Sequence, residues 1–254
     1  MNPMHRAALA LLAIALRGQD GYEIQVYASP TVPPRATMFE LHSNFVFQGV
    51  KDHVDGVYPT EHTWHETVEI THGWTNWFET GFYIFTAAGK EFGWQYVGSH
   101  FRPRFRVPPS WRWPVGVSIS QEIGWASRKF TTNPWSYELR PIVDKQLGRW
   151  YLGFNPVLEK SLHGEDARRG WLFSPNVKVS ATTVSKVALG FEYYGNLGPL
   201  TGFDPFKNQE QQIIPTVDLN FGPKWEFNFG VGVGITGSTE HVVAKLILGY
   251  RFGL

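Results

Sequence analysis

The side chains in this 254-residue chain whose spacing first suggests catalysis are Glu40, His42 and Ser43. A serine nucleophile needs a histidine close enough to accept its hydroxyl proton, and a carboxylate often orients that histidine. If the segment is a β-strand, however, His42 and Ser43 point to opposite faces of the sheet because they are neighbours. The two side chains could not then act on each other, and we expect no catalytic residues.

Metal binding is a weaker possibility at the start of the next apolar stretch. His62 and His65 are flanked by Glu61 and Glu66, but a His-x-x-His pair would need helical or loop geometry to converge on one ion. The chain has no cysteine, which excludes disulfides and thiolate metal sites. We expect neither a metal nor a cofactor.

Ionisable residues recur at every second position of several stretches, as Arg102 and Arg104 or Glu138 and Arg140 do, so each set would share one face of a strand. Charges on a buried face must be paired or hydrated. The face therefore either lines a pore that selects small anionic or polar solutes, or forms a salt-bridge network that fills a narrow lumen and conducts little. The candidate lumen residues are Glu40, His42, Glu69, Glu79, His100, Arg102, Arg104, Glu122, Glu138, Arg140, Asp144, Glu159, Lys178, Glu192, Asp218, Glu226, Lys245 and Arg251.

The elements that would position these residues are strands, because apolar and polar side chains alternate from Tyr22 almost to the end of the chain. After a short leader strand at Tyr22–Ala28, the alternation predicts twelve strands, mostly of about ten to twelve residues. Soluble strands are usually about five or six residues long, whereas a tilted transmembrane strand needs about 9–11. The predicted strands cover approximately 37–47, 62–72, 77–86, 93–106, 114–123, 135–145, 149–160, 171–180, 186–195, 211–220, 225–235 and 242–253.

The connections between these strands alternate in length. Long polar links at 48–61, 124–134, 161–170 and 196–210 alternate with short ones at 73–76, 146–148, 182–185 and 221–224. The link at 107–113 is intermediate, and those at 87–92 and 236–241 are short although they fall on the long side. Long outer loops and short periplasmic turns are typical of outer-membrane barrels, and an even strand number places both ends of the barrel on the short-turn side.

The apolar face of each predicted strand is unusually bulky. Trp225, Phe227 and Phe229 alternate with Glu226 and Asn228, and 16% of all residues, including 11 tryptophans, are aromatic. A membrane barrel turns such a face to lipid and its polar face to the lumen, so its mean hydropathy stays ordinary, here -0.23. We therefore predict an all-β fold, a closed antiparallel transmembrane β-barrel of about 12 strands. A soluble β-sandwich would bury the same face between two sheets.

Proline is the main difficulty for this interpretation. Pro103, Pro141, Pro156, Pro175 and Pro215 all lie inside predicted strands, in phase with the apolar face. Proline cannot donate a ladder hydrogen bond, so we expect either β-bulges or pairing that is lost near one rim of the barrel.

The N-terminus has the pattern of a secretory signal peptide, predicted to cover residues 1–20 and to leave a barrel domain at 21–254. His5 and Arg6 precede an apolar run at 7–16, which is too short to span a bilayer, and Ala13 and Ala15 offer a cleavage site. The net charge of +1 gives no electrostatic reason to expect nucleic acid as a partner.

Two segments resemble known outer-membrane proteins. Lys245-Leu-Ile-Leu-Gly-Tyr-Arg-Phe-Gly-Leu254 is similar to the terminal strand that the barrel assembly machinery reads, although the usual final aromatic residue is replaced by Leu254. Glu69-Ile-Thr-His-Gly-Trp-Thr-Asn-Trp-Phe-Glu-Thr-Gly81 resembles a strand–turn–strand unit of uncharacterised outer-membrane barrels, including the family named for the meta-pathway of phenol degradation. This resemblance implies contact with outer-membrane lipid and with the assembly machinery.

The expected function is a passive channel or transport-related pore for small solutes in the bacterial outer membrane, hydrophobic or aromatic ones if the phenol-pathway resemblance is meaningful. Two alternatives remain open. One is an extracytoplasmic β-sandwich that binds glycans through its tryptophans, and the other, less favoured, is an outer-membrane lipid hydrolase. The known lipase signature places His and Ser two residues apart and continues with Asn-Gly, which this chain lacks.

Overall fold

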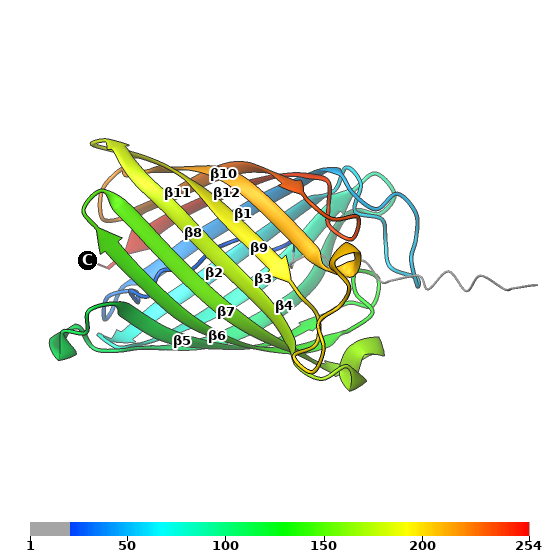
Figure 1. The fold of residues 1–254 in the computed structure, drawn as a ribbon, viewed down its shortest axis with the longest axis horizontal. Helices are drawn as coiled ribbons and strands as arrows, with labels where there is room; N and C mark the ends of the chain where they lie inside the picture. The colour runs from blue at the N-terminus through cyan, green and yellow to red at the C-terminus, as the bar shows by residue number, and fades with distance from the viewer. Residues whose placement is uncertain (1–20, 254) are drawn as a thin grey trace, which may run out of the picture.

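The computed structural model describes residues 21–253, which form one closed antiparallel barrel (Figure 1). Each strand pairs with its neighbours in the sequence, and β1 pairs with β12 to close the ring. The strands are β1 (Thr37–Gln48), β2 (Trp64–Thr75), β3 (Phe78–Gly89), β4 (Gly93–Arg106), β5 (Gly116–Ala126), β6 (Trp135–Leu147), β7 (Trp150–His163), β8 (Leu172–Val184), β9 (Val187–Asn196), β10 (Glu210–Leu219), β11 (Trp225–Gly234) and β12 (Val242–Phe252).

This architecture confirms the predicted fold class and the number of strands. The ends of the strands lie within about four residues of the ranges predicted from alternation, which is the usual error of such a prediction. The closed ring has no pair of stacked sheets, so the sandwich alternative is wrong for the described residues. No helix in the described part of the chain is long and apolar enough to cross a membrane.

The two faces of the wall differ as the alternation predicts. In β11, Trp225, Phe229 and Val231 are exposed on the outside, while Asn228 and Gly230 are buried on the inside. A ring of strands can turn only one face inward, so the bulky apolar side chains form the outer surface and the polar ones meet in the lumen.

The connections fall at two ends of the barrel. The β2–β3, β6–β7, β8–β9 and β10–β11 links are short turns at the end that also holds the start of β1 and the end of β12. The links β1–β2, β5–β6, β7–β8 and β9–β10 are longer and lie at the other end, where the last two carry the 3₁₀ turns η2 (Glu165–Arg168) and η3 (Phe206–Asn208). The rigid β4–β5 link at the turn end contains η1 (Pro109–Trp111).

The strand prolines are accommodated without bulges. Pro141 in β6 and Pro156 in β7 lie opposite each other in a gap of the ladder, between the paired residues Leu139↔Leu158 and Val143↔Phe154. The register is the same on both sides of this gap. The expectation of bulges, or of lost pairing near a rim, is therefore wrong here: pairing is interrupted in the middle of the strands, and the missing proline N–H explains why.

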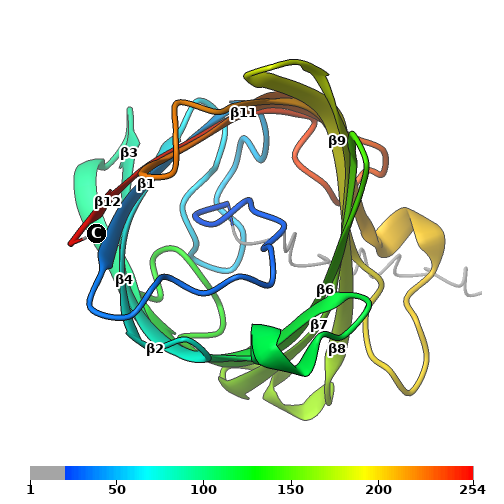
Figure 2. The same ribbon diagram turned by 90° about the vertical axis from the view of Figure 1, so that its left-hand side faces the viewer.

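The segment 21–36 lies inside the ring of strands, where Figure 2 shows it in dark blue. At its start, Asn44 donates a hydrogen bond to the carbonyl of Gly21 near the loop end, and at its other end the amide of Arg35 donates to the carbonyl of Gly73 near the turn end. The segment thus runs along the lumen. Residues 23–27 are all buried, because wall surrounds them on every side.

The leader strand predicted at Tyr22–Ala28 is therefore wrong, since these residues pair with no strand. Alternation suggested a strand, but an extended chain whose backbone groups bond to side chains has the same local pattern. The predicted signal peptide at 1–20 lies outside the described residues.

Candidate functional site in the barrel lumen

The N-terminal segment is attached to the wall by side chains from several strands. Asn155 of β7 accepts a hydrogen bond from the Tyr27 amide at 2.8 Å and donates one to the Tyr27 carbonyl at 3.0 Å. Asp144 of β6 accepts hydrogen bonds from both the amide and the hydroxyl of Ser29, at 2.7 and 2.8 Å. Buried backbone groups need such partners when no sheet ladder supplies them.

Three further charged side chains bind the backbone of the same segment. Arg104 donates to the carbonyls of Ala28 and Pro30, Lys245 donates to the carbonyl of Ile24, and Glu79 accepts from the amide of Val32. Residues predicted from sequence as pore lining thus contact the N-terminal segment of their own chain.

An ion network surrounds this attachment on β2, β3 and β4. Arg102 lies 2.5 Å from Glu69 and 3.5 Å from Glu79, while Arg104 lies 2.7 Å from Glu79. All four are buried in the described structure. The guanidinium of Arg102 also lies 4.9 Å from the centre of the Tyr27 ring, a favourable cation–π distance. The two arginines are therefore neutralised and are not free to attract an anionic solute.

A second network joins β8, β9, β10 and β12. Lys178 lies 3.1 Å from Glu192 and 2.7 Å from Asp218, and Lys245 forms an ion pair with the same Glu192. The Tyr194 hydroxyl donates a hydrogen bond to Glu192 at 2.7 Å. This carboxylate bridges two ammonium groups, so it stabilises the wall between non-adjacent strands.

The remaining candidates lie mostly in the half of the lumen near the loops. His100 pairs with Glu122, and Arg140 lies 2.6 Å from Glu138. These four residues and Glu159 line one cavity. Arg251 is partly buried near the end of β12, and Glu40 and His42 lie side by side on the inner face of β1.

The cavity has a volume of about 340 Å³ and lies between the N-terminal segment and the loops. Tyr22, Glu23 and Ile24 of the segment form part of its wall. Acidic groups outnumber basic ones on its wall, because seven carboxyl groups line it beside two basic side chains, Arg140 and Lys160, and the two imidazoles of His65 and His100. The acidic residues are Glu23, Asp52, Glu122, Glu138, Glu159, Glu210 and Glu240.

Three aromatic rings close part of the cavity at the loop end. Tyr58 of the β1–β2 loop lies 4.7 Å from the Phe92 ring and 5.5 Å from the Phe130 ring, which belong to two other loops. The Tyr58 amide also donates a hydrogen bond to the carbonyl of Lys129 at 2.8 Å. The loops therefore fold over the mouth of the barrel as a packed unit.

The candidate catalytic pair is separated as its strand position requires. His42 is buried on the inner face, whereas Ser43 donates a hydrogen bond to Glu66 at 2.5 Å on the other side of the wall. His62 and His65 belong to no group of three or more potential metal ligands within residues 21–253. His65 is buried and stacks on Tyr22 at 4.5 Å.

Sequence reasoning missed the lumen residues that carry no charge. Asn155 and Asn44 bind the N-terminal segment, and Tyr27 provides its central ring. The inward phase of both asparagines follows from the alternation, but their partners could not be found from it. The prolines at 30, 33 and 34 were a usable sign that the chain does not pair in a sheet there.

Comparison of the fold with solved structures gives bacterial outer-membrane channels. The KdgM porin matches with a TM-score of 0.57 at 10% identity, over 85% of this chain and 99% of that one. An outer membrane channel from Pseudomonas putida F1 matches with a TM-score of 0.59 at 9% identity, over 91% and 100% of the two chains. The NanC porin matches at 0.55 and 8%, over 85% and 100%.

The chain has an outer-membrane porin fold. No family model and no curated protein matches it in sequence, so the resemblance to the phenol-pathway family stays a prediction.

Proposed function

We propose that this protein is a passive channel for small solutes in the bacterial outer membrane. The observation that carries the proposal is the closed twelve-stranded barrel with bulky apolar side chains outside and ionised side chains inside. Apolar side chains on the outer face contact lipid, whereas charged side chains on the inner face are hydrated or form ion pairs. The fold shared with porins supports the same function.

The N-terminal segment limits conduction in this proposal. It occupies the lumen from Gly21 near the loops to Ala36 near the turns, and polar contacts hold it at both ends. Solutes would pass through the lumen in one of two ways. Either the segment moves aside, or the solutes follow a narrow hydrated path around it. The protein would thus conduct less than an open porin of the same strand number.

The charge of the cavity suggests which solutes enter. Its excess of carboxyl groups favours cationic or neutral polar solutes over anions, because a lined constriction of one sign concentrates the opposite charge. The expected preference for anionic solutes rested on arginines such as Arg102 and Arg104, and these are in ion pairs. The cavity wall also carries aromatic side chains, including Tyr22 and Phe85. These side chains offer an apolar contact surface to the hydrophobic or aromatic solutes that the phenol-pathway resemblance implies.

Export through a signal peptide and insertion by the barrel assembly machinery belong to this proposal. The last strand, β12, ends in the apolar outer residues Leu248, Tyr250 and Phe252, which is the pattern expected of a terminal recognition strand. We assign no enzymatic role, since the serine and histidine considered for one lie on opposite faces of β1.

Conductance in a planar bilayer tests the channel function, with a reversible lock as the sharpest comparison. A Cβ added at Gly116 would lie 2.1 Å from the Ser29 hydroxyl and 2.0 Å from Oδ1 of Asp144. Ser29→Cys and Gly116→Cys, combined with Asp144→Ala to remove that overlap, therefore place two thiols within reach of a disulfide in a chain without other cysteines. We expect current in the reduced protein and a large reduction after oxidation.

A second variant without residues 21–34 should conduct more than the whole chain. Heat-modifiable gel migration shows whether each variant is folded. A folded barrel that stays silent when reduced, and also without residues 21–34, would reject the channel function.

A further inference from the structure

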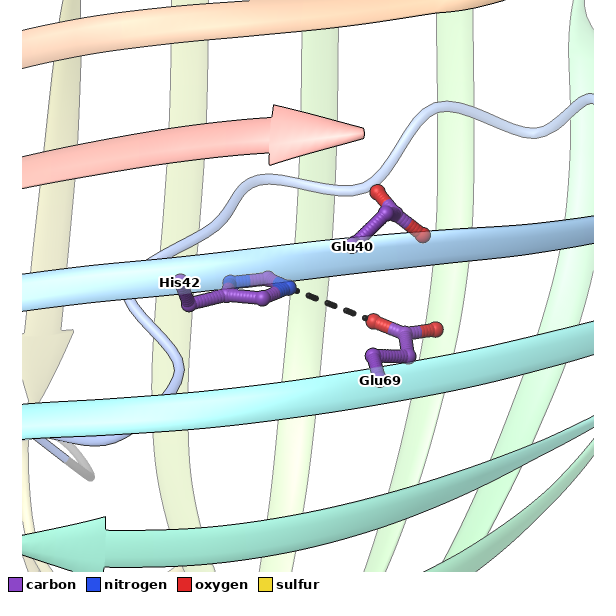
Figure 3. Close-up of side chains that lie close together, drawn as sticks. All are labelled: Glu40, His42 and Glu69. Atoms are coloured by element: carbon purple, nitrogen blue, oxygen red, sulfur yellow. Dashed lines mark ion pairs between the residues drawn. The ribbon is translucent and has the colours of Figure 1, made fainter. Parts of the chain in front are cut away.

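Glu40, His42 and Glu69 form a compact group of potential metal ligands on the inner face of the barrel (Figure 3). Glu40 and His42 are two residues apart on β1 and so share a face, and Glu69 of β2 is the direct cross-strand partner of Glu40. One ligand atom from each residue lies within 4.8 Å of the others. The register between β1 and β2 brings these three side chains together.

His42 is fully buried, and neither of its ring nitrogens makes a hydrogen bond of ordinary geometry within residues 21–253. Its Nε2 lies 3.4 Å from the Oε2 of Glu69, which is an ion pair when the ring is protonated. Its Nδ1 has no polar partner among the same residues. Buried polar atoms nearly always have partners, so a missing one indicates a ligand that the protein atoms alone do not supply.

The charges around this group leave one carboxylate without a cation. Arg102 and Arg104 pair with Glu69 and Glu79, whereas Glu40 forms no hydrogen bond or ion pair among the described residues. Glu40 is nevertheless buried. An isolated buried carboxylate is very unfavourable, and a cation between it and the other two ligands would compensate the charge.

Gly249 of β12 lies between Glu40 and Glu226 in the cross-strand register. A Cβ added at Gly249 would lie 2.4 Å from the Cε of Met38, 2.9 Å from the Cγ of Glu40 and 3.1 Å from the Cβ of Glu226. The side chains of Met38 and Glu40 therefore occupy the space that the missing Cβ leaves. The Glu226 carboxylate accepts a hydrogen bond from Gln25 at 3.1 Å.

We propose that Glu40, His42 and Glu69 bind a divalent transition-metal ion of the zinc type. One imidazole nitrogen with carboxylate oxygens suits zinc-type ions, whereas calcium and magnesium prefer oxygen ligands alone. Two ligands of a tetrahedral ion with bonds of about 2.0–2.1 Å lie about 3.4 Å apart. The Nε2 of His42 and the Oε2 of Glu69 already have this separation.

The surroundings of Glu69 fit a metal ligand. Its Oε1 accepts hydrogen bonds from Arg102 and from Thr71, at 2.5 and 2.7 Å, which fixes the carboxylate and leaves Oε2 directed toward His42. Ligating carboxylates are commonly oriented in this way by outer hydrogen bonds. The Tyr27 hydroxyl also approaches Oε2, at 3.2 Å, so metal binding would act directly on the N-terminal segment.

The site is tested with zinc on the folded, chelator-treated full-length barrel. We expect about one zinc per chain by elemental analysis, and a rise in the unfolding temperature as free zinc increases. His42→Gln and Glu40→Gln should each weaken zinc binding by tenfold or more. His65→Gln is the matched control, since it removes another buried imidazole from the same inner face, and it should leave binding unchanged.

A measurement on the unmodified protein covers the case in which the variants do not fold. X-ray absorption at the zinc edge should show one imidazole among oxygen ligands, since the site holds a single histidine. Several imidazoles around the zinc would assign it to the loop histidines and overturn the proposal. So would the absence of bound zinc, or an equal loss of binding in His65→Gln. None of these outcomes depends on whether the barrel conducts.

Discussion

Asn155 and Tyr27 are joined by a reciprocal pair of hydrogen bonds, in which one side-chain amide satisfies both backbone groups of a residue 128 positions away. The arrangement imitates one rung of a β-ladder. It holds the N-terminal segment at the point where the Tyr27 ring meets Arg102 and Arg140, whose guanidinium groups lie 4.9 and 4.8 Å from its centre. The segment is thus fixed at its middle as well as its ends.

Replacing Asn155 by leucine should therefore release the segment and increase conductance. Two hydrogen bonds of about 0.5–1.5 kcal/mol each are lost, so the docked form loses about 1–3 kcal/mol, which corresponds to about a 5- to 150-fold rise in the released fraction. Single-channel recording measures this change as open probability. Asn176→Leu is the control, because Asn176 is the cross-strand partner of Asn155, is also buried and makes no hydrogen bond to the Tyr27 backbone. An equal effect of both substitutions would contradict the assignment.

Removing the charge of Arg102 should destabilise the barrel strongly. Arg102→Leu leaves Glu69 without its closest cation in a buried setting, and breaking such a pair typically costs about 3–5 kcal/mol. The temperature at which the barrel unfolds, measured by heat-modifiable gel migration, should fall markedly. Adding Glu69→Gln should restore part of the loss, since the unpaired charge is then gone. Arg149→Leu, at an arginine that stacks on Trp150 in a turn, should change little.

The acidic cavity should make the channel cation-selective. In a potassium chloride gradient the reversal potential is expected to indicate preference for potassium over chloride, and the preference should weaken at high salt because charges are screened. Asp52→Asn together with Glu159→Gln should reduce the preference without closing the channel. Anion selectivity in the unmodified protein would show that the cavity does not lie on the conduction path.

The packing of the loops should depend on pH through Glu240. This side chain accepts a hydrogen bond from Thr60 of another loop at 2.5 Å. Burial raises the pKa of Glu240 from its ordinary value of 4.5 to about 7, the Thr60 hydroxyl lowers it in part, and the nearby Glu61 raises it. Below pH 4.5 the Glu240 carboxyl is protonated in both the packed and the released loop. Between pH 4.5 and about 7 it is protonated only in the packed loop, so the stability of the packed loop falls as pH rises. Above pH 7 this contribution to stability is fully lost.

The loss corresponds to about 3 kcal/mol, since each pH unit in this interval contributes about 1.4 kcal/mol. Spin labels on cysteines placed at Val57 and Gly237 should therefore report a wider distance distribution at pH 8 than at pH 5.5. Glu240→Gln should keep the narrow distribution at both values, because the amide cannot ionise. A pH response that persists in this variant would point to Glu61, whose carboxylate also faces Lys51 at 3.7 Å.

The wall of the barrel could be predicted from the sequence because its cause is local. In a strand, side chains two positions apart share a face, so the alternation around Phe227 or Leu246 determines both the strand and the side that meets lipid. The short links then indicate that strands adjacent in sequence are neighbours in the barrel, and the alternation of long and short links distinguishes its two ends. The inward position of residues such as Glu69, Arg102 and Lys245 follows from the same alternation.

Only the tertiary structure decided what those inward residues contact. Residues 22–28 have a strand-like pattern, but the place of the segment 21–36 in the lumen depends on partners such as Asn155, Asp144 and Arg104, which are more than 70 residues away along the chain. The same holds for the group of Glu40, His42 and Glu69, because it requires the register between β1 and β2. A local pattern records the face of a residue, whereas pairing across the lumen depends on the closure of the ring, which no single segment of the sequence contains.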